Sequence, residues 1–125
     1  MRDKEAFLIV EDEPDMCWAL EHILKAKGFP SKVAPNGHEA LALMRQHRFH
    51  SVFLDAKLPD IEGLELAKML KDVNPDIHVV LLSGYFYNDD AAVENALSQG
   101  LICWFIGKPF SLHEIMKAIK IAQSM

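Results

Sequence analysis

The feature that most constrains the fold is a regular alternation of short apolar runs with helical periods. Runs such as "FLIV" at 7–10 and "VVLL" at 79–82 are almost continuously apolar. Strands of this kind are buried on both faces, which is typical of parallel sheets that are covered by helices. The runs predict these strands: Ala6–Val10, Lys32–Ala34, Ser51–Leu54, His78–Leu82 and Cys103–Ile106.

Helical periods fill the segments between these runs. The pattern predicts helices over 15–27, 38–47, 63–73, 89–99 and 111–123. Gly28 follows the first of them, as a residue just past a helix end commonly is, and Ser111 to Glu114 reads S-x-x-E, a capping box. Five strand–helix units without an interrupting linker predict one domain over 1–125, an α/β doubly wound three-layer sandwich.

Length and charge narrow the function classes. The chain has 125 residues, half of them apolar, and a net charge of −5 from 18 acidic and 13 basic residues. The basic residues form no cluster of the kind that binds nucleic acid directly. No apolar run approaches the ~20 residues of a membrane span. We therefore expect a soluble, cytoplasmic protein that binds neither nucleic acid nor a membrane.

The ends of the predicted strands carry the polar residues of interest. In doubly wound sheets the ligand site lies outside the carboxyl ends of the strands. There the sequence places a hydroxyl, an ammonium group and several carboxylates: Glu11, Asp12 and Glu13 after the first strand, Asp55 after the third, Ser83 after the fourth and Lys108 after the fifth. We expect these groups to converge on one site.

Such a set favours a bound cation. Two carboxylates ~5 Å apart repel by roughly 3 kcal/mol at an effective dielectric constant of 20, a large fraction of the ~5 to 15 kcal/mol that stabilises a domain. All the expected ligands are hard oxygens, which suits Mg²⁺ or Mn²⁺ better than zinc. Mg²⁺ commonly binds through one or two carboxylates and a phosphate.

Four segments of the sequence resemble a known family. "FLIVEDEPDM", "SVFLDAKLPDIEGLEL", "VVLLSGY" and "FIGKPF" resemble, in this order, the receiver domain of two-component response regulators. The resemblance implies a flavodoxin-like fold with the strand order 2-1-3-4-5. It also implies a phosphorylation-controlled signalling switch rather than a conventional turnover enzyme.

The resemblance gives the acidic residues their roles. Asp55 would accept a phosphoryl group from a sensor histidine kinase or a phosphotransfer protein. Asp12 and Asp55 would bind Mg²⁺ directly, together with the backbone carbonyl of Lys57, and Glu11 would act through a water molecule. Lys57 departs from the usual pattern, because its side chain would border the phosphoryl group.

The resemblance also implies a switch. Lys108 would pair with a phosphoryl oxygen, and its bond to Pro109 resembles the family's cis peptide. Ser83 would donate its hydroxyl to another phosphoryl oxygen, and Phe105 would then rotate, with Trp104 as an alternative aromatic. The face formed by 89–99, Cys103–Ile106 and 111–123 would bind an output domain, an output protein or a second copy of the domain.

Several alternatives stay open at this point. A degenerate receiver would bind partners without phosphorylation. A flavodoxin-type cofactor binder is disfavoured, because the acids after the first strand would repel a phosphate. An aspartyl-phosphate phosphohydrolase is disfavoured because Lys57 stands where such enzymes carry a second acid.

Two smaller features also stay open. The apolar residues around Tyr85–Tyr87, Ile102 and Trp104 indicate either an enlarged core or a docking face. His47 and His50 have no evident third metal ligand in the sequence, which favours surface roles for both.

Overall fold

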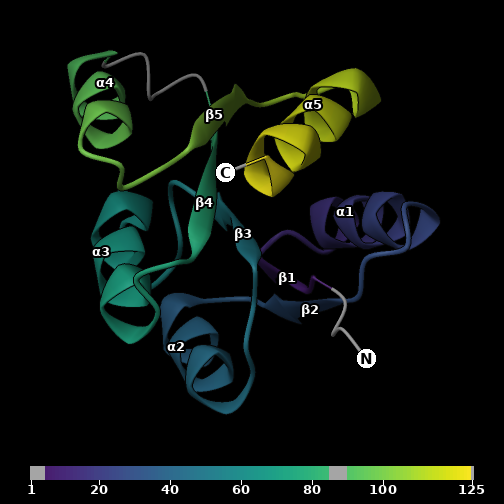
Figure 1. Ribbon diagram of the computed structural model, residues 1–125, viewed down its shortest axis with the longest axis horizontal. Coiled ribbons are helices and arrows are strands. Elements are labelled where there is room, and N and C mark those ends of the chain that lie inside the picture. Colours follow the sequence, from purple (N-terminus) through teal and green to yellow (C-terminus); the bar gives the residue numbers. More distant parts are fainter. Residues whose placement is uncertain (1–4, 85–89, 125) are drawn as a thin grey trace.

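The computed structural model describes residues 5–84 and 90–124 and shows five strands alternating with five helices (Figure 1). The elements are β1 (Phe7–Val10), α1 (Pro14–Ala26), β2 (Ser31–Ala34), α2 (Gly37–Gln46), β3 (Ser51–Asp55), α3 (Gly63–Val73), β4 (His78–Ser83), α4 (Asp90–Ser98), β5 (Trp104–Gly107) and α5 (Leu112–Gln123). Each predicted element is confirmed, with bounds that differ from the predicted ones by at most one residue.

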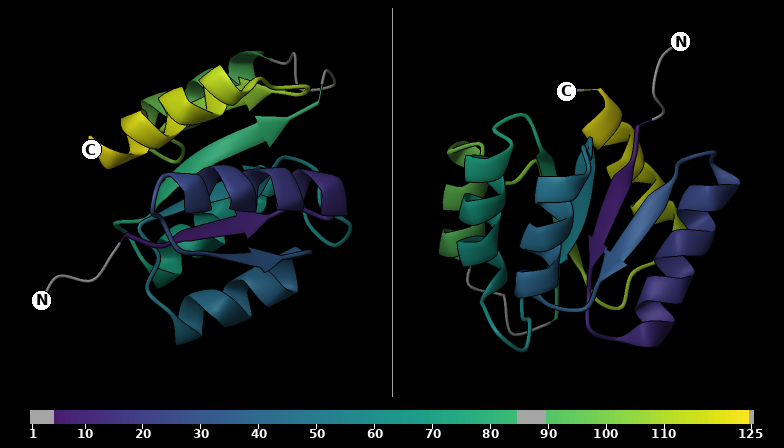
Figure 2. Two further views of the ribbon diagram at one scale, coloured as in Figure 1. Left: turned by 90° about the vertical axis from the view of Figure 1, so that its right-hand side faces the viewer. Right: turned by 90° about the horizontal axis from the view of Figure 1, so that it is seen from below.

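The strands form one parallel sheet in the order β2-β1-β3-β4-β5. The doubly wound architecture and the strand order implied by the resemblance are therefore confirmed. Helices α1 and α5 cover one face of the sheet, and α2, α3 and α4 cover the other (Figure 2). In both views of Figure 2 the strands run the same way, so their carboxyl ends share one edge of the molecule.

The two faces of the sheet have separate cores, which explains why the strands are almost continuously apolar. Leu8, Val52 and Leu81 are fully buried under α2, α3 and α4, whereas their strand neighbours Phe7 and Phe53 are fully buried under α1 and α5. Successive side chains of a strand point to opposite faces. Since helices cover both faces, the positions between the ends of β3 and β4 and all positions of β1 are apolar.

The predicted helix-end signals are present. Gly28 has a φ of 86° and follows the C-terminus of α1, where the left-handed conformation favours glycine. The side chain of Ser111 accepts a hydrogen bond from the backbone N–H of Glu114, whose own side chain accepts one from the N–H of Ser111. This reciprocal capping box fixes where α5 begins and thereby fixes the segment after β5 that carries Lys108.

The apolar region between β4 and β5 is only partly within the described residues. Tyr85, Phe86 and Tyr87 lie outside them. Ile102 is 2% exposed and belongs to the core, which favours an enlarged core at this position. Trp104 is partly buried and packs toward the α1–α5 face of the sheet. Among the described residues, no helix is long and apolar enough to cross a membrane.

Candidate functional site

Three predicted carboxylates meet at the carboxyl edge of the sheet. Oxygens of Glu11, Asp12 and Asp55, one from each, lie within 4.8 Å of one another. Glu11 is 1% exposed and Asp55 is 6% exposed, whereas Asp12 is exposed. Two buried acids and one exposed acid therefore form a cluster that is open to the solvent on the side of Asp12.

Lys108 is the cation within this cluster. Its Nζ donates a hydrogen bond to Oε2 of Glu11 at 2.8 Å and lies 3.4 Å from Oδ1 of Asp55. The Lys108–Pro109 peptide bond is cis, as the resemblance implies. The backbone N–H of Lys108 also donates to the carbonyl oxygen of Ser83 at 2.6 Å, which joins the ends of β4 and β5.

Burial and charge perturb the two partners of this ion pair. Burial raises the pKa of Glu11 from 4.5 to about 7, and the charge of Asp55 adds to this effect, while the hydrogen bond from Lys108 opposes it. Burial alone would lower the pKa of Lys108, but the hydrogen bond and charge of Glu11, with the charge of Asp55, outweigh burial and raise it. A buried carboxylate is therefore kept next to a second one at an energetic cost.

The loop between β3 and α3 supports Asp55. The backbone N–H of Lys57 donates to Oδ1 of Asp55 at 3.3 Å, and the N–H of Gly63 donates to the carbonyl oxygen of Ala56 at 2.7 Å. A Cβ atom at Gly63 would lie 2.6 Å from the carbonyl oxygen of Asp55 and 2.7 Å from Cα of Ala56. Only glycine allows α3 to begin this close to the end of β3.

Asp60 fixes the same loop from its other side, and sequence reasoning missed it. Its two carboxylate oxygens accept hydrogen bonds from the backbone N–H groups of Gly37 and His38, at 2.9 and 3.0 Å. These N–H groups are at the N-terminus of α2, where a carboxylate is favourable, and the bond from Gly37 is the main cause that lowers the pKa of Asp60. The only signal in the sequence is an aspartate in a turn, and this does not indicate which backbone groups its carboxylate binds.

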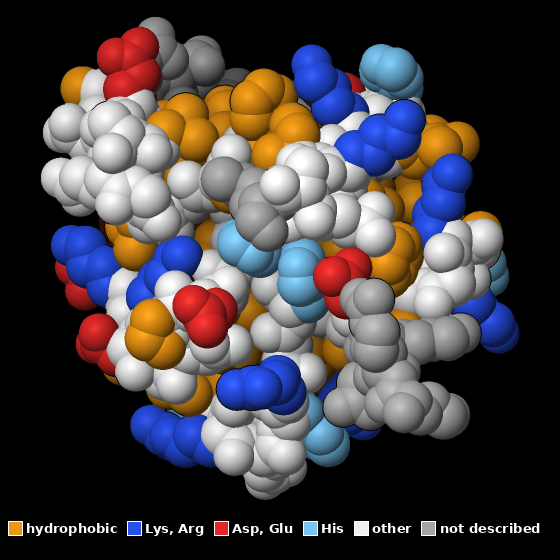
Figure 3. All heavy atoms as spheres, viewed as in Figure 1, with side chains coloured by type: hydrophobic (Ala, Val, Ile, Leu, Met, Phe, Trp, Pro, Cys, Tyr) orange, Lys and Arg blue, Asp and Glu red, His pale blue; other side chains and the backbone are white. Residues whose placement is uncertain are grey.

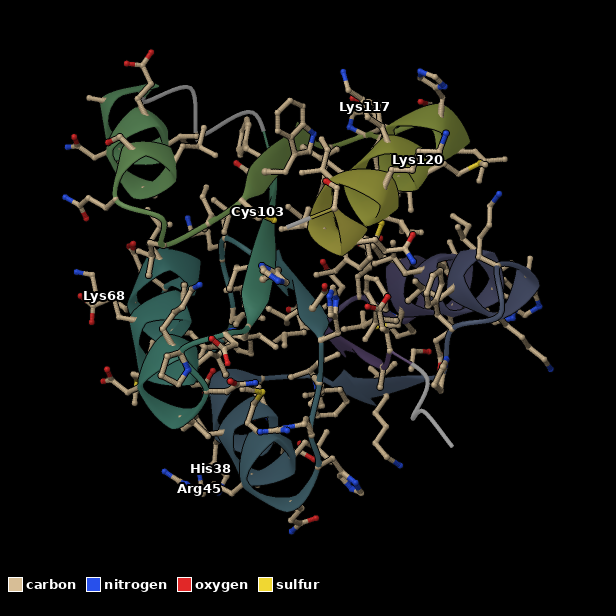
Figure 4. The ribbon with its side chains drawn as sticks, in the orientation of Figure 1. His38, Arg45, Lys68, Cys103, Lys117 and Lys120 are labelled. Carbon is tan, nitrogen blue, oxygen red and sulfur yellow. The ribbon has the colours of Figure 1, made fainter. Side chains whose placement is uncertain are left out.

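The predicted switch residues lie beside this site. Ser83 is fully buried, and its hydroxyl donates to the carbonyl oxygen of Gly84 at 2.8 Å. Phe105 pairs in register with Leu81 and packs against the core under α2–α4, whereas Trp104 packs on the opposite face. Lys117 of α5 lies over the Trp104 ring at 5.3 Å from its centroid, and Figure 4 shows Lys117 and Lys120 on α5 beside β5.

Glu13, the third acid after β1, is not part of the described cluster of donors. Its side chain is exposed, and its backbone precedes α1 as the N-cap residue. The N–H of Glu13 donates to Oε1 of Glu11 at 3.3 Å. Glu13 therefore helps to hold Glu11 through its backbone.

The donor set fits a hard divalent cation. Three carboxylates supply oxygen ligands within the reach of one ion, and neither histidine nor cysteine belongs to the cluster. Mg²⁺ and Mn²⁺ prefer such ligands. Burial is the main cause that raises the pKa of Glu11, and the charge of Asp55 adds to it, so a nearby cation would stabilise the ionised carboxylates. The carboxylates of Glu11, Asp12 and Asp55 could hold such an ion.

Comparison with known proteins agrees with this geometry. The family model "Response regulator receiver domain" matches residues 7–120. Sporulation initiation phosphotransferase F of Bacillus subtilis is 30% identical over 116 residues, which cover 93% of this chain and 91% of that protein. Transcriptional regulatory protein ZraR of Salmonella typhimurium is 30% identical over 98% of this chain, but the chain spans only 27% of ZraR.

A solved structure gives the same result. The receiver domain protein of Methanospirillum hungatei, described as CheY-like, superposes with a TM-score of 0.84 at 26% identity, and the match covers 94% of this chain and 92% of that one. The family match extends over nearly the whole chain, and the strand order and the acidic edge are those that the sequence resemblance led us to expect. The chain therefore belongs to the receiver domain family of the two-component response regulators.

Proposed function

We propose that this protein is a phosphorylation-controlled switch in which Asp55 accepts the phosphoryl group with the help of Mg²⁺. One observation carries the proposal: the carboxylate of Asp55 shares a cluster of donors with Glu11 and Asp12 and lies 3.4 Å from the ammonium group of Lys108. A carboxylate and a phosphoryl group are both negatively charged, so the attack of one on the other needs positive charge nearby to offset their repulsion. Receiver domains of this family are signalling switches, and the proposal extends that role to named residues.

The chemical step uses the residues as follows. An oxygen of Asp55 attacks the phosphorus of a phosphohistidine, the nitrogen–phosphorus bond breaks, and its electron pair returns to the imidazole. Mg²⁺, when bound, would be held by Asp12, Asp55 and the backbone carbonyl of Lys57, with Glu11 acting through water, and would supply positive charge that offsets the charge of the phosphoryl oxygens. Lys108 pairs with a second phosphoryl oxygen, and the backbone N–H of Lys57 holds Asp55 in orientation.

The switch step begins at Ser83. Its hydroxyl donates to a backbone carbonyl here, so it has to turn away from that carbonyl to reach a phosphoryl oxygen. Phe105 is next to β4 and on the α4 side of the sheet, which supports Phe105 rather than Trp104 as the aromatic that follows the hydroxyl. The face formed by α4, β5 and α5 would change as a result.

The partners follow from this mechanism. We propose that residues 1–125 act as a single receiver domain in the cytoplasm, with a sensor histidine kinase or phosphotransfer protein as donor. The changed face would control an output domain, an output protein or a second copy of the domain. A receiver that binds partners without phosphorylation is the alternative, and the complete set of Asp55, Ser83 and Lys108 counts against it.

Phosphorylation with a small-molecule donor tests the proposal. The protein is incubated with acetyl phosphate and Mg²⁺, and intact mass is measured for the wild type, Asp55→Asn and Asp60→Asn. Asp60 is the matched control, because it is an aspartate in the loop that follows Asp55 and its oxygens cap α2. We expect the mass of one phosphoryl group on the wild type and on Asp60→Asn only. An equal adduct on Asp55→Asn would refute Asp55 as the acceptor.

The metal site has a separate test. Mg²⁺ that binds the folded protein raises the melting temperature, and Asp12→Asn should remove most of this rise. If the melting temperature of the wild type does not respond to millimolar Mg²⁺, the carboxylates do not form the proposed site.

A further inference from the structure

The opposite edge of the sheet carries a second group of potential ligands, which the proposed function does not use. A cavity of about 770 Å³ opens at the amino ends of the strands. Figure 3 looks onto this edge and shows histidine side chains gathered near its centre. Three imidazoles line the cavity together with two carboxylates: His47, His50, His78, Glu5 and Asp76.

The fold brings three of these side chains together from different strands. His50 immediately precedes β3 and His78 begins β4, and the backbone N–H of His78 donates to the carbonyl oxygen of His50 at 3.2 Å. The N–H of His50 in turn donates to the carbonyl oxygen of Ala6, which follows Glu5. Glu5, His50 and His78 are therefore neighbours across β1, β3 and β4.

The distances between these side chains match those between ligands of one ion. The ring centroids of His50 and His78 are 4.9 Å apart, and two imidazoles bound to a tetrahedral ion at about 2.0–2.1 Å have centroids on the order of 5 Å apart. Nε2 of His50 lies 3.3 Å from Oε2 of Glu5, and two ligand atoms of such an ion are also about 3.3 Å apart. Each pair is thus spaced for shared coordination.

The second nitrogen of His50 is already anchored. Nδ1 of His50 lies 2.7 Å from the hydroxyl oxygen of Ser51, which is fully buried. A hydrogen bond at one ring nitrogen fixes the ring and directs the other nitrogen, which is the usual arrangement around a histidine ligand.

Other donors near this group are less suitable. The ring of His47 packs edge-on against Phe49 at 6.1 Å between centroids, so the pairing of His50 is with His78 and not with His47. Cys103, just before β5 (Figure 4), shares a smaller cavity with His78, but its side chain packs against the apolar core under α1 and α5.

We propose that His50 and His78 bind a divalent transition metal ion of the Zn²⁺ class, with Glu5 as the third protein ligand and a water molecule in the fourth position. Within the described residues only Glu11, Asp12 and Asp55 already bring three donor atoms within 4.8 Å of one another. The side chain of Glu5 or His78 would therefore have to rotate for all three ligands to reach one ion. The side chains of Glu5 and His78 are only partly buried at the mouth of the cavity, so they can rotate in this way. Imidazole nitrogen selects Zn²⁺, Ni²⁺ or Co²⁺ over Mg²⁺, so the two ends of the sheet would bind different ions.

Titration calorimetry with Zn²⁺ on tag-free protein tests this site. Millimolar Mg²⁺ is present throughout so that the acidic site is occupied. We expect one Zn²⁺ to bind per chain, with an affinity that falls about tenfold or more in His50→Gln and in His78→Gln, and about tenfold in Ser51→Ala. His47→Gln and Cys103→Ser are the matched controls and should bind as the wild type does.

Each outcome decides the proposal. The metal-free melting temperature shows whether each variant is folded. The two histidine variants test the site independently, so the test is valid if at least one of them is folded. The proposal is wrong if no stoichiometric Zn²⁺ binding occurs, or if His50→Gln and His78→Gln bind Zn²⁺ as tightly as the wild type. It is also wrong if Asp12→Asn or Cys103→Ser abolishes binding, because the ion would then be held elsewhere.

Discussion

Replacing Glu11 by glutamine should make the metal-free protein more stable at slightly alkaline pH. Glu11 is 1% exposed, and burial raises its pKa to about 7. At pH 8 the folded protein therefore keeps an ionised carboxylate where desolvation and the charge of Asp55 oppose it. Glutamine preserves the size of the side chain, and its carbonyl oxygen can still accept a hydrogen bond from Lys108, but it carries no charge.

The size of the effect follows from the pKa of Glu11. The difference between its ordinary pKa of 4.5 and about 7 corresponds to about 3 kcal/mol, at about 1.4 kcal/mol for each tenfold change in the acid dissociation constant. Removal of the charge would stabilise the variant by up to this amount, but part of the stabilisation is lost because Lys108 then donates to a neutral amide instead of a carboxylate. We expect the free energy of unfolding at pH 8 to rise by about 1–2 kcal/mol.

The dependence on pH separates this cause from a general change in packing. Since the folded state has the higher pKa at Glu11, it binds more protons than the unfolded state between pH 4.5 and about 7. The contribution of Glu11 to stability therefore falls as the pH rises through this window and is constant above it. The advantage of Glu11→Gln should be largest at pH 8 and should vanish toward pH 4.5.

Urea unfolding with a metal chelator at pH 5 and pH 8 measures both effects. Glu94→Gln is the control, because Glu94 is an exposed acid on α4 and the chemical change is the same. A Glu11→Gln protein that is no more stable than the wild type at pH 8 would refute the reasoning. A gain of equal size at pH 5 would also refute it, since Glu11 is then largely protonated in the folded wild type.

Three further substitutions test residues that hold the loops and helix ends around the site. Gly63→Ala should lower the free energy of unfolding by about 1–3 kcal/mol in urea, because its Cβ would meet the backbone of β3, whereas Gly107→Ala meets no atom within 4 Å and should be nearly neutral. Asp60→Ala should lower the melting temperature near pH 7, and the difference should disappear as the pH falls through the lowered pKa of Asp60, because the wild type then loses its charged cap as well. Ser111→Ala should cost about 1 kcal/mol in urea unfolding, since it removes the capping box of α5.

The sequence predicts the sheet and the acidic edge well, because both depend on local patterns. Continuous apolar runs indicate strands that are covered on both faces, and parallel strands bring their carboxyl ends to one edge. The sequence alone therefore predicts that Asp12 and Asp55 lie close together, as the structure shows. A residue can be assigned to a strand end from the local sequence, without knowing which residues it contacts.

What the sequence could not predict are the pairings across the fold. Asp60 caps a helix that begins 23 residues earlier, and His50 pairs with His78 although His47 is nearer in sequence. Such contacts depend on how the strands and loops are placed in space, and the residue types alone permit many partners. The same holds for Lys108: the sequence did not indicate that its ammonium group would lie closer to the carboxylate of Glu11 than to that of Asp55.

The pairing of Lys108 with Glu11 has a consequence for how the site would work. The ammonium group of Lys108 lies 2.8 Å from Glu11 and offsets the charge of the neighbouring acids, which a divalent cation would also do. A cation at Asp12 and Asp55 would weaken the hold of the acids on Lys108 and leave it available for a phosphoryl oxygen. Binding of the cation and of a phosphoryl group should then be coupled, and by linkage each should strengthen the other by the same factor. The ion pair would thus keep the acceptor site closed to an anion until the cation has bound.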